Sequence, residues 1–132
     1  MSKLIYIAGS ITDDPDYYAK FSEADEALER SGYTALSPAW LPPEMDRSQY
    51  ARIILSMIDS ADAVLFLPDA EDSKGAQLEA LYCDYIGKPV ACRVEDLDPA
   101  IRNLYLTSQK SAVDVLENLK KGGKRNARQE DT

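Results

Sequence analysis

The 132-residue chain contains no histidine, only two cysteines and a single tryptophan. Without histidine, nucleophilic catalysis of the Ser-His-Asp and Cys-His types is excluded, and so is a zinc site built from histidine and cysteine. Any acid–base chemistry must come from carboxylates, tyrosines or lysines. The two cysteines, Cys83 and Cys92, are typical of buried thiols in a reducing cytoplasm. We therefore expect no metal and no cofactor.

Positive charge is also scarce, since 15 basic against 23 acidic residues give a net charge of −8. Duplex nucleic acid and anionic membrane surfaces both need a basic face, which argues against either as a partner. No apolar run approaches the ~20 residues of a membrane span, and residues 1–6 lack a secretory signal. The sequence therefore predicts a cytoplasmic protein with a small-molecule partner, which a few local donors could hold even if it is anionic.

Short apolar runs alternate with stretches of helical periodicity. Strands are expected at 4–8, 33–36, 63–67 and 90–92, with a further edge strand at 104–106. Helices are expected at 15–31, from 46 or 48 to 61, at 75–86 and at 112–119. This alternation predicts right-handed βαβ units, and hence an α/β, three-layer, flavodoxin-like parallel sheet of four or five strands in the order 2-1-3-4-5. We expect one domain over residues 1–120 and a disordered polar tail over 121–132.

Local signals fix the ends of several elements. Asp14 can cap the first helix with Pro15 at its first position, and Gly32 ends that helix. Three prolines within 37–43 predict an extended loop. The acidic run 69–72 is expected to form a solvated rim.

Two loops border the expected switch point of the sheet, between its first and third strands, where ligands bind in such folds. The first begins with Gly9 and Ser10, and the second contains Ser73 and Gly75. Ser10 is either a phosphate donor or an ordinary turn serine. Ser73 is expected to cap the next helix, a role that is compatible with ligand binding.

Glu79 is the main candidate for chemistry. Its helix presents one apolar face, and Glu79 places a carboxylate in it near the positive end of the helix; the positions on this face are 75, 78, 79, 82, 83 and 86. Burying a charge is costly, which favours a function over a simple dipole partner at the edge of the face. We expect desolvation and helix amides to offset each other, so that the pKa of Glu79 leaves it ionised at neutral pH.

Four further residues have both a functional and a structural interpretation. Tyr6 either orients the carboxylate or belongs to the core, and Trp40 either stacks on a base or packs its own loop. Asp72 is a solvated loop acid or a catalytic acid. Asp62 closes the turn from helix to strand or assists catalysis.

Four segments in this order, 6–10, 61–64, 73–79 and 87–90, resemble the nucleoside 2-deoxyribosyltransferase-like superfamily over residues 4–92. The match is to a small phage and bacterial branch, related to deoxynucleoside monophosphate N-glycosidases. The resemblance implies that Glu79 is a nucleophile for the sugar anomeric carbon and that Tyr6 lies close to it. It also implies that Gly75 lets the backbone approach the ligand, and that Ser10 or Ser73 holds a 5′-phosphate.

The chain departs from the superfamily at the second acidic position, where it has Ile54. Asp72 or Asp62 would then have to assist the leaving base. The resemblance implies an N-glycosidase or deoxyribosyltransferase acting on a nucleoside or nucleotide. The alternatives are a non-catalytic nucleotide-binding or sensing domain and an oligomeric accessory protein. It also implies a homodimer or larger homo-oligomer, with the 50–61 helix and the last helix as candidate surfaces.

Overall fold

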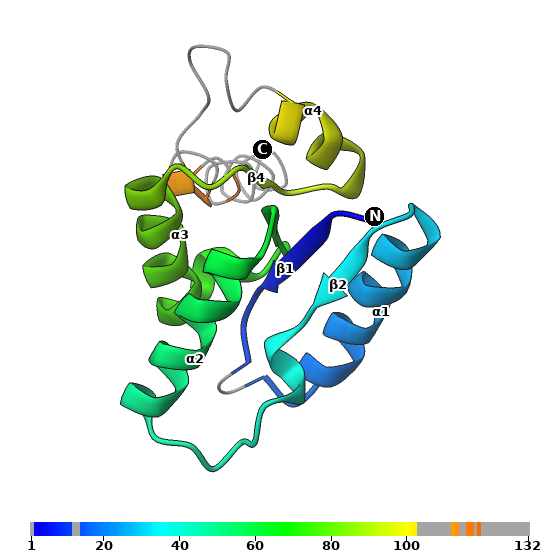
Figure 1. The fold of residues 1–132 in the computed structure, drawn as a ribbon. Coiled ribbons are helices and arrows are strands. Elements are labelled where there is room, and N and C mark those ends of the chain that lie inside the picture. Colours follow the sequence, from blue (N-terminus) through cyan, green and yellow to red (C-terminus); the bar gives the residue numbers. More distant parts are fainter. Residues whose placement is uncertain (1, 12–13, 103–111, 114–115, 118, 120–132) are drawn as a thin grey trace, which may run out of the picture.

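Four parallel strands form the centre of the fold in the computed structural model, which describes residues 2–11, 14–102, 112–113, 116–117 and 119 (Figure 1). They are β1 (Leu4–Ala8), β2 (Thr34–Leu36), β3 (Ala63–Phe66) and β4 (Val90–Ala91), in the order β2-β1-β3-β4. In register, Ile5 pairs with Ala35 on one side and with Ala63 on the other. The predicted α/β parallel sheet and its order are confirmed for these strands. The expected edge strand at 104–106 and the tail at 121–132 lie outside the described residues.

Helices cover both faces of the sheet, giving three layers (Figure 1). They are α1 (Tyr17–Arg30), α2 (Arg47–Ser60), α3 (Lys74–Ile86) and α4 (Leu97–Arg102). Side chains alternate along each strand, so Ile5 and Ile7 pack with α1 and α4, while Tyr6 and Ala8 pack with α2 and α3. Strands buried on both faces read as continuous apolar runs, as they do here.

Most helix ends follow from capping chemistry. Asp46 caps α2 in a capping box with Gln49, and Ser73 caps α3. Gly32, with φ +88°, follows α1, and Gly87, with φ +73°, follows α3; this left-handed conformation favours glycine. These predicted ends are confirmed.

Two local predictions are wrong. Helix α1 begins at Tyr17 and not at Pro15, because the Asp14 carboxylate accepts a hydrogen bond from the Asp16 backbone N–H (2.9 Å) in a turn before the helix. Residues 38–40 form a turn of 3₁₀ helix where an extended loop was expected. Proline fits the first position of such a turn, and the Ser37 hydroxyl accepts from the Ala39 N–H (3.2 Å).

The core on the α2–α3 side includes residues from the last predicted helix. The described residues among 112–119 are helical, and Ala112 and Leu116 are buried against this core. The Asp84 carboxylate on α3 accepts hydrogen bonds from the backbone N–H groups of Ala112 and Val113, the latter at 3.1 Å. Among the residues with described positions, no helix is long and apolar enough to cross a membrane.

Candidate functional site

Glu79 lies one turn into α3, with its side chain directed at the sheet. It is 5% exposed and is surrounded along its helix by the buried residues Ala76, Ala80 and Cys83. The Ser73 hydroxyl caps this helix by accepting a hydrogen bond from the Ala76 N–H (3.2 Å). Glu79 is therefore buried as predicted, but the predicted face of the helix is only partly right. The buried residues of α3 are 76, 79, 80 and 83, whereas Gly75, Leu78 and Ile86 of the predicted face are exposed.

Tyr6, in the middle of β1, is the nearest polar neighbour of this carboxyl. It is fully buried, and burial together with Glu79 raises the pKa of its phenol. Within the described part of the chain, neither the Tyr6 Oη nor the Glu79 Oε2 has a hydrogen-bond partner with normal geometry. The two groups still interact, since the Tyr6 hydroxyl acts to lower the pKa of Glu79. Tyr6 and Glu79 therefore lie close together, as predicted. They form a buried polar pair in which the Tyr6 Oη and the Glu79 Oε2 could each make a further hydrogen bond.

Burial dominates the charge state of Glu79. Desolvation raises the pKa of its carboxyl to about 8, and the Tyr6 hydroxyl opposes this only in part. The expectation of an ionised carboxylate at neutral pH is therefore wrong for the free protein. The expected offset from helix amides is missing, because the Ala76 N–H donates to the Ser73 hydroxyl and the Gln77 N–H donates to the Ser73 carbonyl. No backbone N–H of the described residues donates to Glu79.

Gly75 leaves space between the helix cap and the carboxyl. A Cβ atom at Gly75 would lie 3.6 Å from the Ser73 Oγ and 3.9 Å from the Glu79 Oε1, which is ordinary contact distance. The glycine is therefore not required by packing. The Ser73 Oγ and the Glu79 Oε1 thus lie on either side of the position where a side chain at residue 75 would stand.

Gly9 and Ser10 lie beside Asp69, which follows β3. A Cβ atom at Gly9 would lie 2.9 Å from the Leu67 Cδ1 and 3.2 Å from the Leu67 Cβ and the Asp69 Oδ1, so any larger residue there requires these side chains to shift. The Ser10 N–H donates to the Asp69 carboxylate (3.2 Å), which also pairs with Lys20 of α1 (3.1 Å). Neither Asp69 nor Lys20 was predicted as part of a site, since the acidic run 69–72 was expected to be a solvated rim. The position of Asp69 at the carboxyl end of a strand was the available signal.

The contacts described for the other three candidates, Trp40, Asp72 and Asp62, are with residues other than Glu79. Trp40 is 62% exposed and packs edge-to-face on Tyr18, with ring centroids 5.1 Å apart. Asp72 is exposed on the 3₁₀ turn before α3. Asp62 accepts a hydrogen bond from the Leu4 N–H (2.8 Å), which places it at the amino ends of β1 and β3, opposite Gly9 and Ser10. This contact joins the start of β3 to the start of β1.

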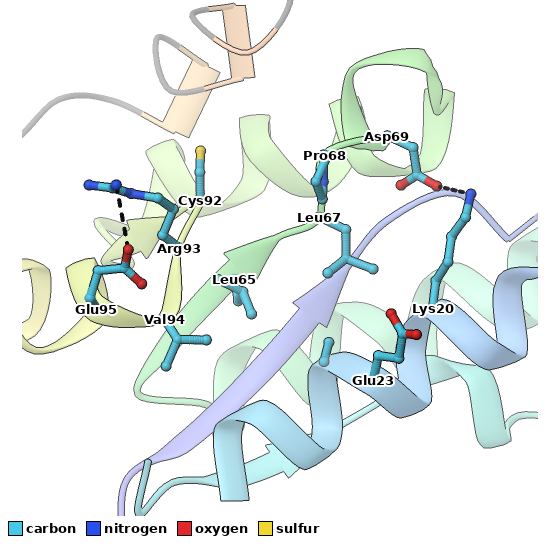
Figure 2. Close-up of a pocket in the computed structure, with 11 residues that line it drawn as sticks. Lys20, Glu23, Leu65, Leu67, Pro68, Asp69, Cys92, Arg93, Val94 and Glu95 are labelled. Carbon is cyan, nitrogen blue, oxygen red and sulfur yellow. Dashed lines mark hydrogen bonds and ion pairs between the residues drawn. The ribbon is translucent and has the colours of Figure 1, made fainter. Parts of the chain in front are cut away.

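A cavity of about 520 Å³ lies on the opposite face of the sheet, beside α1 (Figure 2). Glu79 is not among its lining residues. No group of three or more potential ligand side chains in the described part of the chain could hold a metal ion.

The fold and the buried Glu79–Tyr6 pair define a doubly wound α/β protein with a candidate site on its third helix. The chain belongs to the family described as "Domain of unknown function (DUF4406)", whose model matches residues 3–92. No curated protein matches the chain.

Two solved structures share the fold. A 2-deoxyribosyltransferase from Bacillus psychrosaccharolyticus is 26% identical, with a TM-score of 0.55 over 66% of this chain and 69% of that chain. A conserved protein from Enterococcus faecalis V583 is 19% identical, with a TM-score of 0.52 over 92% of this chain and 99% of that chain, and shows the fold alone. The first match supports a distant relationship with the 2-deoxyribosyltransferase.

Proposed function

We propose that the chain acts on the base–sugar bond of a nucleoside or nucleoside monophosphate, as an N-glycosidase or a 2-deoxyribosyltransferase, with Glu79 as nucleophile. The observation that carries this proposal is a carboxyl group only 5% exposed whose Oε2 has no partner among the described residues. A stable core has no need of such a costly group, whereas active sites often contain one with a shifted pKa. The fold shared with a 2-deoxyribosyltransferase at 26% identity supports the proposed substrate class.

The reaction would proceed through a glycosyl ester. The ionised Glu79 carboxylate attacks the anomeric carbon, and the base departs with the electrons of the C–N bond and takes up one proton. Water then attacks the ester in hydrolysis, or a second base attacks it in transfer, and the carboxylate is regenerated. Tyr6 would orient the carboxylate. Asp62 lies at the amino ends of the strands, opposite Gly9 and Ser10. We therefore assign the role of proton donor to the leaving base to Asp72.

Substrate binding would use the polar groups near the start of α3 and the end of β1. Ser73 and Ser10 are the proposed partners of the sugar or its 5′-phosphate, and Gly75 provides the space beside them. The start of a helix of this length favours an anion. Trp40 with its neighbour Tyr18 offers an exposed aromatic surface for the base.

The direct test is release of free base from nucleosides and nucleoside monophosphates, followed by chromatography. Glu79→Gln removes the nucleophile with little change in shape, and should lower the rate by several orders of magnitude. Glu26→Gln, at an exposed position of α1, is the matched control and should keep the wild-type rate. Since the pKa of Glu79 is about 8, the rate should rise with pH up to about 8 as the reactive carboxylate forms. A fully active Glu79→Gln enzyme would refute the role of Glu79.

A nucleotide-binding or sensing domain without turnover is the second candidate function. Ile54, which stands at the second acidic position of the superfamily, is 2% exposed and packs in the same core cluster as Tyr6. Binding of a nucleotide without base release by the wild type, and no release by a folded Ile54→Asp variant, would favour this candidate. Base release gained by Ile54→Asp would favour an enzyme that lacks its second acid.

We also propose that the chain forms a homodimer or larger homo-oligomer through α3. Three side chains on the outer face of α3, Leu78, Leu81 and Tyr85, are 47%, 59% and 89% exposed. Helical spacing places them in one stripe, and exposed apolar patches of this kind often mark interfaces. The 50–61 helix contributes less, with Ile53 38% exposed and Tyr50 half-buried. Light scattering should show an assembly for the wild type and a monomer for Leu81→Lys, whereas a monomeric wild type would contradict this proposal.

A further inference from the structure

The cavity beside α1 is a groove on the face of the sheet opposite Glu79. It runs over β3 between α1 and the segment that follows β4, and has a volume of about 520 Å³, within the range of small-molecule sites (Figure 2). Its apolar lining is formed by Ala24, Leu65, Leu67 and Val94. Leu65 and Ala24 belong to the core cluster on the α1 side, whereas Tyr6 belongs to the cluster on the other side. The groove and Glu79 therefore lie on opposite faces of the sheet, and Asp69, which lines the groove, also accepts a hydrogen bond from the Ser10 N–H.

Both cations of the groove already have carboxylate partners. Lys20 pairs with Asp14 (2.6 Å) and Asp69 (3.1 Å). Arg93, at the far end, pairs with Glu95 (3.4 Å) and with Asp96, at 3.0 Å. An anionic ligand would have to compete with these contacts.

Glu23 is the carboxylate that remains available. It lines the groove from α1, next to Lys20 (Figure 2), and has no ion-pair partner in the described part of the chain. Three lining acids, Glu23, Asp69 and Glu95, stand against the two cations. The net charge of −8 further attracts cations over longer distances.

We propose that this groove binds a small organic cation, a molecule with an aromatic or aliphatic body and a protonated amine. The apolar body lies on Leu65, Leu67 and Val94, and the ammonium group pairs with the Glu23 carboxylate. The apolar lining provides burial for the body, and the carboxylate at the rim selects the sign of the charge.

The probe is 2-phenylethylamine, compared with neutral 2-phenylethanol and anionic phenylacetate by NMR titration of the ¹⁵N-labelled full chain. The amine should bind most tightly and shift the amide signals of Ala24, Leu65 and Val94. Glu23→Gln should weaken amine binding by about threefold or more, the range of a partly exposed ion pair, and leave binding of the alcohol unchanged. Glu26→Gln, on the same helix but outside the groove, should bind the amine like the wild type.

A second variant tests the location. Ala24→Leu adds bulk to the lining of the groove and should weaken binding of both the amine and the alcohol. Because Glu23 is exposed, the Glu23→Gln variant should fold. It therefore still tests the proposal if Ala24→Leu fails to fold. Equal affinity for amine and alcohol, amine binding that Glu23→Gln leaves intact, or no shift at these three amides would each overturn the proposal.

Discussion

The buried carboxyl of Glu79 should make the protein less stable as the pH rises. Its pKa is about 8 in the folded state, against an ordinary value of 4.5. Between these two values the folded state binds more protons than the unfolded state, so the free energy of unfolding falls with pH. The stability that the raised pKa of Glu79 contributes is fully present below pH 4.5 and is lost as the pH rises through 8. The opposite sign holds for an acid whose pKa is lowered by an ion pair.

The size of this effect follows from the two pKa values. At 1.36 kcal/mol per pH unit, the shift from 4.5 to about 8 corresponds to about 5 kcal/mol. About 3 kcal/mol of this is already lost at pH 7, because the unfolded state is then ionised and the folded state is still mostly protonated. A domain of this size has a total stability of about 5–15 kcal/mol, so the effect is a large part of the whole.

Glu79→Gln isolates the effect, since glutamine has nearly the shape of the protonated side chain and does not titrate. Urea unfolding followed by circular dichroism should give similar stabilities for wild type and variant at pH 5. The variant should be more stable by about 3 kcal/mol at pH 7 and by about 5 kcal/mol at pH 9. Glu26→Gln should show no such pH-dependent difference. A constant difference between wild type and Glu79→Gln from pH 5 to 9 would refute burial of this carboxyl.

Four further substitutions test the surroundings of the site. Gly9→Ala should destabilise the protein by about 1–3 kcal/mol in urea unfolding, because its Cβ would lie 2.9 Å from a leucine side chain. The matched Gly75→Ala, with only ordinary contacts on a helix, should leave stability unchanged or raise it by up to about 1 kcal/mol; equal losses at both positions would contradict the geometry. Tyr6→Phe should raise the pKa of Glu79 further in a ¹³C NMR titration, since the lost hydroxyl favours the carboxylate. Ser73→Ala should cost about 1 kcal/mol through loss of the helix cap, and an unchanged midpoint would count against that cap.

The sequence was sufficient for features that depend on local patterns. The order of the sheet followed from apolar runs and βαβ connections, and the ends of α3 followed from Ser73 and Gly87. Burial of Glu79 was predicted from an apolar helix face, although only Glu79 and Cys83 of that face are buried. These features need only the neighbours along the chain.

Features that depend on residues far apart in the sequence could not be predicted from local patterns. The ion pair of Asp69 with Lys20 joins residues 49 positions apart, and no local pattern specifies it. The charge state of Glu79 was mispredicted because desolvation, the largest cause of its raised pKa, depends on how completely distant parts of the chain cover the carboxyl. The start of α1 was misplaced for a similar reason, since the Asp14 carboxylate is used by the turn that precedes the helix.

The contact of Asp84 with the segment at 112–113 has a consequence for where the folding unit ends. The family match stops at residue 92, but the side chains of Leu97, Ala112 and Leu116 fill the two cores beyond that point. A polypeptide ending at residue 92 would expose the apolar surface beneath them and leave the Asp84 carboxylate without the two N–H groups that it accepts. Helix α3 also contains Glu79. Truncation would therefore loosen the packing around its carboxyl, whose pKa is raised because the group is shielded from water.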